Sequence, residues 1–296
     1  MDSTPVMFEQ VAVFGPGLIG GSMGLAMRRR QLARRIRGIG RRAESLDRAL
    51  AVGAIDEATL EPGRGVRDAD LVILATPIRA LPAIASAIAP HLKPGALVTD
   101  VASTKAEVVR TIASALGSRP DVAYVPSHPM AGSERSGPEA AAADLFEGAV
   151  CILTAGADTD PAAAAVERLW KALGARVVHM TPEAHDRTVA RVSHLPHLAA
   201  AALMVELDPG QAALCGRSLL DTTRVASGDP EIWIDICASN RKQVRQAVLD
   251  HVAVLRQMAD SLAAGDLEPL RRLLVDARTR REGLLRTRPT APPDNT

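Results

Sequence analysis

The sequence has few cysteines, almost no net charge and no long apolar run. Cys151, Cys215 and Cys237 form an odd set without the spacing of metal ligands, so we expect reduced, mostly buried thiols. With 35 Lys and Arg against 34 Asp and Glu, neither a nucleic acid nor a membrane is predicted as a partner. No apolar run reaches the roughly 20 residues of a membrane span, and the first residues lack the basic and apolar segments of a signal peptide. The sequence therefore predicts a soluble, cytoplasmic protein.

The chain is long enough for one large or two moderate domains. Of its 296 residues, 47% are hydrophobic and 23% are charged, which is ordinary for a soluble globular protein. Up to about residue 180, short strand-like runs, most of them apolar, alternate with helical stretches; the runs are residues 11–14, 35–40, 70–75, 96–100, 122–125, 149–154 and 176–180. This alternation is typical of a doubly wound α/β sheet. We therefore predict a Rossmann-like dinucleotide-binding domain over residues 1–180.

The pattern changes at Thr181, which has the character of a helix N-cap, with Pro182 at the first helical position. Only helical stretches follow, so an all-α helical domain is predicted over residues 181–286, with a disordered tail over 287–296. A helical half after a dinucleotide-binding half often mediates dimerisation, and by this analogy we expect a homodimer.

Two prolines shape the predicted helices of this second half. Pro196 is expected to kink the first helix, and Asp229-Pro230 marks a break. After the break, a long amphipathic helix is predicted over residues 231–264 and a further helix over 267–285.

A glycine-rich turn follows the first apolar run. Residues 15–20 read Gly-Pro-Gly-Leu-Ile-Gly and precede a helical pattern, which is the order strand, G-x-G-x-x-G, helix. Gly15 is expected to make the tight turn, Gly17 to let the backbone approach a pyrophosphate, and Gly20 to let the helix pack on the strand. Free N–H groups at the helix start would bind the phosphates, and Leu18 and Ile19 are predicted contacts beside them.

Two further segments bear on the cofactor. A NAD-preferring protein usually has Asp or Glu at the end of the second strand, but here Gly40 is followed by Arg41 and Arg42. Guanidinium groups pair with a 2′-phosphate, so we predict a preference for NADP over NAD. The alternative is a solvated basic turn that opens the next helix. Thr76 and Pro77, which end the third strand, are also predicted cofactor contacts.

His128 stands in a segment rich in proline and glycine. A histidine near its own pKa can accept a proton in one step and return it in another. Pro129 constrains the backbone after it, and Gly132 and Gly137 allow a turning loop. Because the segment follows the apolar run 122–125, it is expected at the carboxyl end of a strand, where ligands bind in open α/β sheets. The alternative is a hydrogen-bonded surface histidine in a loop.

Four further segments stand out: Asp100 to Lys105, His128 to Gly132, Ser193 to His197 and Asp221 to Trp233. Together with the glycine turn, they resemble the prephenate/arogenate dehydrogenase family of tyrosine biosynthesis. The resemblance runs from about residue 11 to residue 285. It implies oxidative decarboxylation of arogenate or prephenate, with hydride transfer to NAD(P).

The resemblance implies roles for individual residues. His128 would be the proton acceptor for the 4-hydroxyl of the substrate, and Ser103 would contact both that hydroxyl and the nicotinamide. Ser103 could also cap the helix that follows it. The resemblance further implies that Arg224 binds a carboxylate in bidentate fashion. The alternative is an ordinary arginine on a helix surface.

The remaining substrate-side residues match the family's motifs in the same way: His197, Ser133, Glu134, Asp221 and Trp233, with Trp233 reaching toward the neighbouring subunit's site. His185-Asp186 matches another family motif, and we expect a structural or interdomain role for it. His194 and His197 could be packing residues or a metal pair; no third ligand is evident, so no metal is predicted.

Substrate preference is less defined. Many family members carry a basic residue where this chain has Leu220, which affects substrate discrimination. The Arg41-Arg42 turn and the Asp100 to Ser103 segment look more like NADP-using arogenate dehydrogenases. The alternatives are a β-hydroxyacid dehydrogenase or imine reductase, which typically has a catalytic lysine on the helical domain, and a catalytically idle dinucleotide-binding regulator.

Overall fold

The computed structural model describes residues 6–133, 135–155, 160–212 and 214–287. The chain divides into two compact units, residues 1–241 and 242–296. The domain boundary predicted at residue 180 falls inside the first unit, between a strand and a helix. The predicted tail lies outside the described residues from 288 on, and Thr287 ends a helix.

The first unit is built on an eight-stranded sheet with the strand order β3-β2-β1-β4-β5-β6-β7-β8. The strands are β1 (Phe8–Phe14), β2 (Ala33–Ile39), β3 (Glu57–Thr59), β4 (Leu71–Leu74), β5 (Leu97–Asp100), β6 (Ala123–Pro129), β7 (Val150–Leu153) and β8 (Arg176–His179). All neighbouring strands are parallel except β6 and β7, which pair antiparallel. The Rossmann-type order confirms the predicted α/β fold, with the order reversing between β1 and β4.

Each predicted run forms a strand in the structure. Among the strands of the described residues, β3 is the one that the sequence did not predict. Its three residues read Glu-Ala-Thr and are half-buried or exposed, so no apolar run marks them. β6 is longer than predicted, because it continues through the polar segment up to Pro129. His128 is therefore a strand residue.

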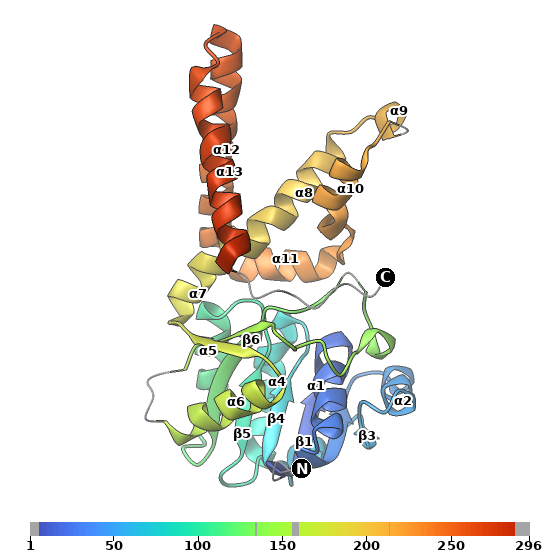
Figure 1. The fold of residues 1–296 in the computed structure, drawn as a ribbon. Helices are drawn as coiled ribbons and strands as arrows, with labels where there is room; N and C mark the ends of the chain where they lie inside the picture. Colours follow the sequence, from blue (N-terminus) through green and yellow to red (C-terminus); the bar gives the residue numbers. More distant parts are fainter. Residues whose placement is uncertain (1–5, 134, 156–159, 213, 288–296) are drawn as a thin grey trace. The chain divides into compact units, whose positions relative to one another are not determined.

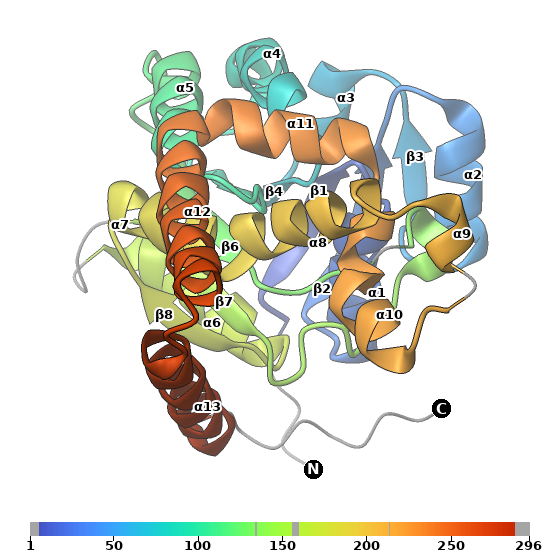
Figure 2. The same cartoon turned by 90° about the horizontal axis from the view of Figure 1, so that it is seen from above.

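Helices cover both faces of the sheet (Figures 1 and 2). They are α1 (Leu18–Arg29), α2 (Ala43–Ala51), α3 (Pro62–Val66), α4 (Leu81–Ile88), α5 (Ala106–Leu116) and α6 (Pro161–Ala172), with short helices η1 (Ile78–Ala80), η2 (Ala89–His91) and η3 (Pro138–Ala140). One core holds buried residues of α1, α2 and α6, and the other holds those of α3, α4 and α5. Successive β1 residues alternate between the cores: Val11 and Val13 face the first, Ala12 and Phe14 the second.

The first unit continues as helices after β8. They are α7 (Pro182–Val189), η4 (Ala190–His194), α8 (Leu195–Val205), α9 (Pro209–Ala212), α10 (Arg217–Thr223), η5 (Arg224–Ser227) and α11 (Pro230–Ser239). Thr181 caps α7 as predicted, because its Oγ1 accepts a hydrogen bond from the backbone N–H of Ala184 at 3.2 Å. The distortion expected at Pro196 takes the form of a π-helical turn, η4, directly before it. Such turns are frequent at functional sites.

The second unit contains α12 (Arg241–Ala264), apart from its first residue, and α13 (Glu268–Thr287). The continuous helix predicted over residues 231–264 is wrong, because the helix breaks at Asn240, whose φ of −115° and ψ of 28° are not helical. The helix predicted over 267–285 is confirmed as α13. Both helices expose large apolar side chains, among them Leu249, Leu255, Leu262, Leu274, Val275 and Leu284. Among the described residues, no helix is long and apolar enough to cross a membrane.

Candidate active site

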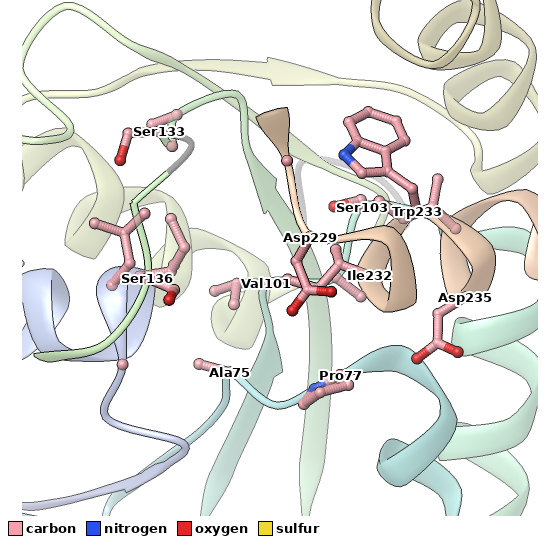
Figure 3. Close-up of a pocket in the computed structure, with 18 of the residues that line it drawn as sticks. Ala75, Pro77, Val101, Ser103, Ser133, Ser136, Asp229, Ile232, Trp233 and Asp235 are labelled. Carbon is pink, nitrogen blue, oxygen red and sulfur yellow. The ribbon is translucent and has the colours of Figure 1, made fainter. Parts of the chain in front are cut away.

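A cavity of about 660 Å³ opens at the carboxyl ends of β1, β4, β5 and β6. Its opposite wall comes from η4, α8, η5 and α11, so the sheet and the helices of the first unit enclose it together. Figure 3 shows Ser133 and Ser136 on one side, Asp229 and Trp233 on the other, and Ala75 and Pro77 below them. Of the predicted site residues, those that line the cavity are Gly15, Gly17, Leu18, Ile19, Thr76, Pro77, Ser103, His128, Ser133, His197, Arg224 and Trp233.

Four predicted site residues are not part of this lining: Gly20, Arg41, Arg42 and Asp221. Gly20 is buried beneath the glycine turn, whereas the other three side chains are exposed. Arg41 and Arg42 follow β2, and Arg42 is the N-cap residue of α2. Glu134 lies outside the described residues.

The glycine turn has the geometry of a dinucleotide cradle. Gly15 has a φ of +73°, and a Cβ there would lie 2.7 Å from the carbonyl oxygen of Ala75. A Cβ on Gly20 would lie 2.5 Å from the carbonyl oxygen of Gly15, so only glycine lets α1 approach the turn so closely. At Gly17 a Cβ would meet no described atom within 4 Å, so this backbone borders open space.

The surroundings of the turn also fit a cofactor. In the described structure no side chain caps the start of α1, which leaves its first N–H groups available for phosphate oxygens. Thr76 Oγ1 is buried and has no hydrogen-bond partner among the described residues, although Thr76 lines the cavity. A buried polar atom of this kind calls for a partner, which a bound nicotinamide dinucleotide would supply.

His128 lies at the carboxyl end of β6, with 7% of its surface exposed. Its Nδ1 is 2.8 Å from Nε2 of His185, and Nδ1 of His185 is 2.8 Å from Oδ1 of Asp186. Burial, together with the charges of His185, Lys105 and His194, holds the pKa of His128 well below the ordinary value for histidine. The alternative of a surface histidine is wrong, and at neutral pH the imidazole is uncharged.

The loop that carries Ser103 is held by a buried ion pair. Lys105 Nζ and Asp100 Oδ1 are 2.5 Å apart, and both side chains are fully buried. Asp100 also accepts hydrogen bonds from the Tyr124 hydroxyl at 2.7 Å and from the backbone N–H of Ala102 at 2.9 Å. Burial lowers the pKa of Lys105, and the nearby Asp100 carboxylate opposes that shift. The network orders the chain on both sides of Ser103.

The start of α5 is capped from a distance. The alternative role of Ser103 as its cap is wrong, because Lys105 occupies the N-cap position. Instead, Asp186 accepts hydrogen bonds from the backbone N–H groups of Lys105 at 2.8 Å and Ala106 at 2.9 Å. Asp186 belongs to α7 and lies 81 positions after Lys105 in the chain, so no local sequence pattern could reveal this cap.

On the helical side, His197 stacks on Trp233. Their ring centroids are 3.5 Å apart and their planes differ by 14°. Burial lowers the pKa of His197, and its Nδ1 is buried with no hydrogen-bond partner among the described residues. Gly228 makes room for the pair, since a Cβ there would lie 2.7 Å from Nε1 of Trp233. Gly228 also lines the cavity, and sequence reasoning had not selected it.

His194 lines the cavity beside this stack. Burial, with smaller effects of His185 and His197, lowers the pKa of His194 to about 4, although Asp186 opposes the shift. The part of the chain that the structure describes contains no cluster of three or more His, Cys, Asp or Glu side chains that could hold a metal. Cys151 is buried, whereas Cys215 and Cys237 are partly exposed, and all three thiols are free.

The cavity also contains carboxylates that sequence reasoning did not select. Asp229 and Asp235 both line it, from the start and the middle of α11. Asp229 Oδ1 accepts a hydrogen bond from the backbone N–H of Glu231 at 2.9 Å and so caps α11. Asp235 Oδ2 lies 3.5 Å from Nε of Arg79. Arg224, exposed on η5, adds positive charge to the same wall.

Comparisons with known proteins agree with this architecture. The family model described as prephenate dehydrogenase, nucleotide-binding domain, matches residues 23–179, and the one described as prephenate dehydrogenase, dimerization domain, matches residues 181–276. The chain is 35% identical over 270 residues to a cyclohexadienyl dehydrogenase of Zymomonas mobilis, which covers 88% of this chain and 90% of that protein.

Solved structures that are similar over nearly the whole chain include the following two. The prephenate dehydrogenase of Aquifex aeolicus in complex with hydroxyphenyl propionate and NAD+ superposes with a TM-score of 0.86 at 31% identity, covering 95% of this chain and all of that one. The arogenate dehydrogenase of Synechocystis superposes with a TM-score of 0.77 at 28% identity, covering 93% and 99%. The chain belongs to the prephenate dehydrogenase family of oxidoreductases.

Proposed function

We propose that the protein catalyses the oxidative decarboxylation of arogenate or prephenate in tyrosine biosynthesis. The observation that carries the proposal is the position of His128: a buried, uncharged imidazole on the wall of a cavity that also contains the glycine turn. Family membership and the similar enzymes named prephenate dehydrogenase and arogenate dehydrogenase support the same reaction.

In this reaction His128 accepts the proton of the substrate's 4-hydroxyl group, and Ser103 orients that hydroxyl. The nicotinamide dinucleotide, when bound, accepts the hydride from the ring carbon that carries the hydroxyl. The ring carboxylate leaves as CO2 and its bonding electrons make the ring aromatic. The product is tyrosine from arogenate, or 4-hydroxyphenylpyruvate from prephenate.

The helical wall supplies the remaining contacts. Arg224 binds a substrate carboxylate, because guanidinium matches two carboxylate oxygens at once. His197 and Trp233, fixed by their stacking, lie beside the substrate, and Ser133 lines the opposite side. Asp221 is exposed on α10 outside the cavity lining, so its substrate role depends on the family resemblance alone.

The cofactor is proposed to be NADP rather than NAD. The support is the pair Arg41 and Arg42 at the end of β2, where no acidic residue would repel a 2′-phosphate. Both side chains are exposed and therefore accessible to a phosphate group.

Arogenate is proposed as the preferred substrate. Arogenate and prephenate differ in one side chain, which carries an ammonium group in arogenate and a keto group in prephenate. Asp229 and Asp235 place negative charge at the cavity, and Asp235 is partly compensated by Arg79. The Asp229 carboxylate would attract an ammonium group and gain nothing from a keto group.

We also propose that the protein is a homodimer assembled through residues 181–286, with residues 1–180 as the dinucleotide-binding domain. The family model for residues 181–276 is described as a dimerization domain. The alternative of an enzyme with a lysine base is not favoured, because no lysine is among the described residues that line the cavity.

The deciding experiment measures kcat/KM for each pairing of arogenate or prephenate with NADP or NAD. Arogenate with NADP is expected to give the highest value, and His128→Asn is expected to lower kcat by orders of magnitude while cofactor binding survives. A dominant pairing of prephenate with NAD would show that the Arg41-Arg42 turn is only solvated surface. No turnover with any pairing would refute the proposed reaction. Full turnover by His128→Asn would refute the role of His128.

A further inference from the structure

A chain of hydrogen-bonded side chains leads from His128 away from the cavity. It runs from His128 Nδ1 to His185 Nε2 and from His185 Nδ1 to Asp186 Oδ1, with both separations at 2.8 Å. The His185 side chain is fully buried and that of Asp186 is 4% exposed. Because water has almost no access, the protonation states of these groups determine which atom donates each hydrogen bond.

Asp186 determines which atom donates and which accepts in each hydrogen bond. Its Oδ1 accepts the backbone N–H of Lys105 and its Oδ2 accepts that of Ala106, so both oxygens already act as acceptors. Burial raises the pKa of Asp186, but the hydrogen bonds from His185, Ala106 and Lys105 outweigh burial and lower it. The group is therefore a carboxylate, which can only accept hydrogen bonds. Nδ1 of His185 must donate to it.

The position of the proton on His185 in turn determines which nitrogen of His128 is protonated. Burial lowers the pKa of His185 in spite of Asp186, so its imidazole is neutral and carries a single proton, on Nδ1. Its Nε2 then holds a lone pair and accepts from Nδ1 of His128. A neutral His128 has no second proton, which leaves its Nε2 unprotonated and free to accept one.

We propose that His185 and Asp186 are positioning residues that hold His128 in the tautomer whose Nε2 accepts the substrate proton. This inference rests on the proposed role of His128. It assigns to the His185-Asp186 pair a role in catalysis beyond the structural role expected from sequence. It also explains why Asp186 caps α5: the cap locks the carboxylate in place for His185.

The chain also supports His128 after proton transfer. The imidazolium then donates from Nδ1 to His185, which in turn donates to the carboxylate of Asp186, and these bonds stabilise the positive charge. Two groups oppose a positive charge on His128: the Lys105 ammonium, which Asp100 balances, and the imidazole of His194. The Cys151 thiol on β7 lies next to the backbone of His128. Since His185 is fully buried, the proton leaves His128 through the cavity.

The test compares two substitutions in the full-length protein with saturating cofactor. His185→Leu removes the acceptor for His128 Nδ1 and is expected to lower kcat about 100-fold while KM changes little; loss of tautomer control in a serine protease triad costs about 10⁴-fold. His185→Gln restores a carbonyl acceptor and is expected to recover kcat to within about 10-fold of wild type. A purely structural role predicts equal losses in both variants.

The pH profile separates positioning from folding. In His185→Leu, the acid limb of kcat is expected at lower pH than in wild type, because the imidazolium has lost its hydrogen-bond acceptor. His179→Leu is the matched control: His179 also pairs with a carboxylate, Glu167 at 3.1 Å, but is exposed and outside the cavity lining, so kcat and its pH profile should not change.

The tautomer of His128 can also be measured directly, without an activity assay. In ¹⁵N-histidine-labelled wild-type protein, NMR should show His128 with a proton on Nδ1 and none on Nε2, the signal being assigned by its loss in His128→Asn. A proton on Nε2, or wild-type kcat and pH profile in His185→Leu, would overturn the inference even if His185→Gln fails to fold. If His128→Asn keeps full turnover, the proposed function of His128 fails instead, whatever tautomer the spectrum shows.

Discussion

At the scale of single residues, burial decides which ionisable groups can take part in chemistry. His128, His194 and His197 all line one cavity and all have pKa values lowered by burial. Neutral imidazoles can accept protons, whereas imidazolium ions cannot. The site is therefore built for a proton acceptor, with positive charge supplied at its edge by Arg224.

The pH dependence follows from the lowered pKa of His128. The rate should fall only when acid protonates His128, so the acid limb of kcat/KM is expected below 6.5, the ordinary value for histidine. The measurement is kcat/KM of wild-type protein from pH 4 to pH 9, with activity recovered at neutral pH as the check on stability. An acid limb at or above 6.5 would mean that another group, or a charged His128, controls the rate.

Arg224→Ala should act on binding. Loss of a hydrogen-bonded charge partner for a carboxylate costs about 1.5–3 kcal/mol, so KM is expected to rise about 10- to 150-fold with a smaller change in kcat. Arg224→Lys keeps the charge without the two-pronged geometry and should give an intermediate KM. Steady-state kinetics with the preferred substrate measure both. An unchanged KM in Arg224→Ala would place the carboxylate elsewhere.

Asp229→Asn tests the substrate preference. Asparagine is as good an N-cap as aspartate, so α11 should keep its start while the cavity loses a negative charge. We expect kcat/KM for arogenate to fall about 10-fold, as loss of an ion pair worth about 1.4 kcal/mol would require, and that for prephenate to stay or rise. Asp208→Asn, at an exposed position outside the cavity lining, is the control. Equal losses for both substrates would refute a role for this charge in selection.

At the scale of elements, the glycine turn joins β1 and α1 through contacts that tolerate no side chain. Gly20 is needed for packing, because the carbonyl oxygen of Gly15 and a methyl group of Val13 occupy the space that a Cβ would need. Gly17 borders open space, so its missing Cβ leaves room for a ligand instead. We therefore expect one glycine of this motif to serve stability and the other to serve binding.

These two roles can be separated by experiment. Gly20→Ala should destabilise the protein by about 1–3 kcal/mol, since the extra methyl group meets backbone and buried side chains that cannot move aside. Gly17→Ala should leave the melting temperature unchanged but weaken cofactor binding. Thermal unfolding and fluorescence titration with NADPH measure the two effects. A Gly17→Ala variant that binds NADPH normally would show that the phosphates do not approach this backbone.

At the scale of the whole molecule, α12 and α13 expose a series of large apolar side chains along both helices. Extensive exposed apolar surface usually marks an interface. Together with the description of the matching family as a dimerization domain, this favours a second copy of the chain as the partner.

The expected mass in solution is therefore about twice the 31.2 kDa of one chain. Leu255 is 50% exposed on α12, and Leu255→Glu should shift the protein toward the monomer by placing a charge in the apolar surface. Arg256→Gln, at the neighbouring exposed position, is the control. Light scattering coupled to size-exclusion chromatography measures the mass. A wild-type monomer would refute the dimer, and an unchanged Leu255→Glu dimer would place the interface elsewhere.

Local pattern was enough for much of the molecule. The strands β1 and β4 to β8 were predicted because each contains an apolar run, and β2, which carries three arginines, from its place in the alternation of strands and helices. The glycine turn was predicted because its residues are adjacent in sequence. The helix starts at Thr181 and Asp229 were likewise visible, since caps act within three residues. Local pattern failed where no local signal exists, as at β3 and at the break at Asn240.

The sequence by itself therefore determined the fold class and the glycine turn, because those signals are short-range. It also singled out His128, Ser103 and Arg224 through recognisable motifs, and all three line the cavity, while their roles stay predictions. Only the tertiary structure decided which groups surround His128. Its partner His185 is 57 positions away, and the backbone groups that hold Asp186 are 80 and 81 positions from it. Contacts across such separations form only when α7 packs against the carboxyl edge of the sheet, and that packing depends on the whole folded unit rather than on any local pattern.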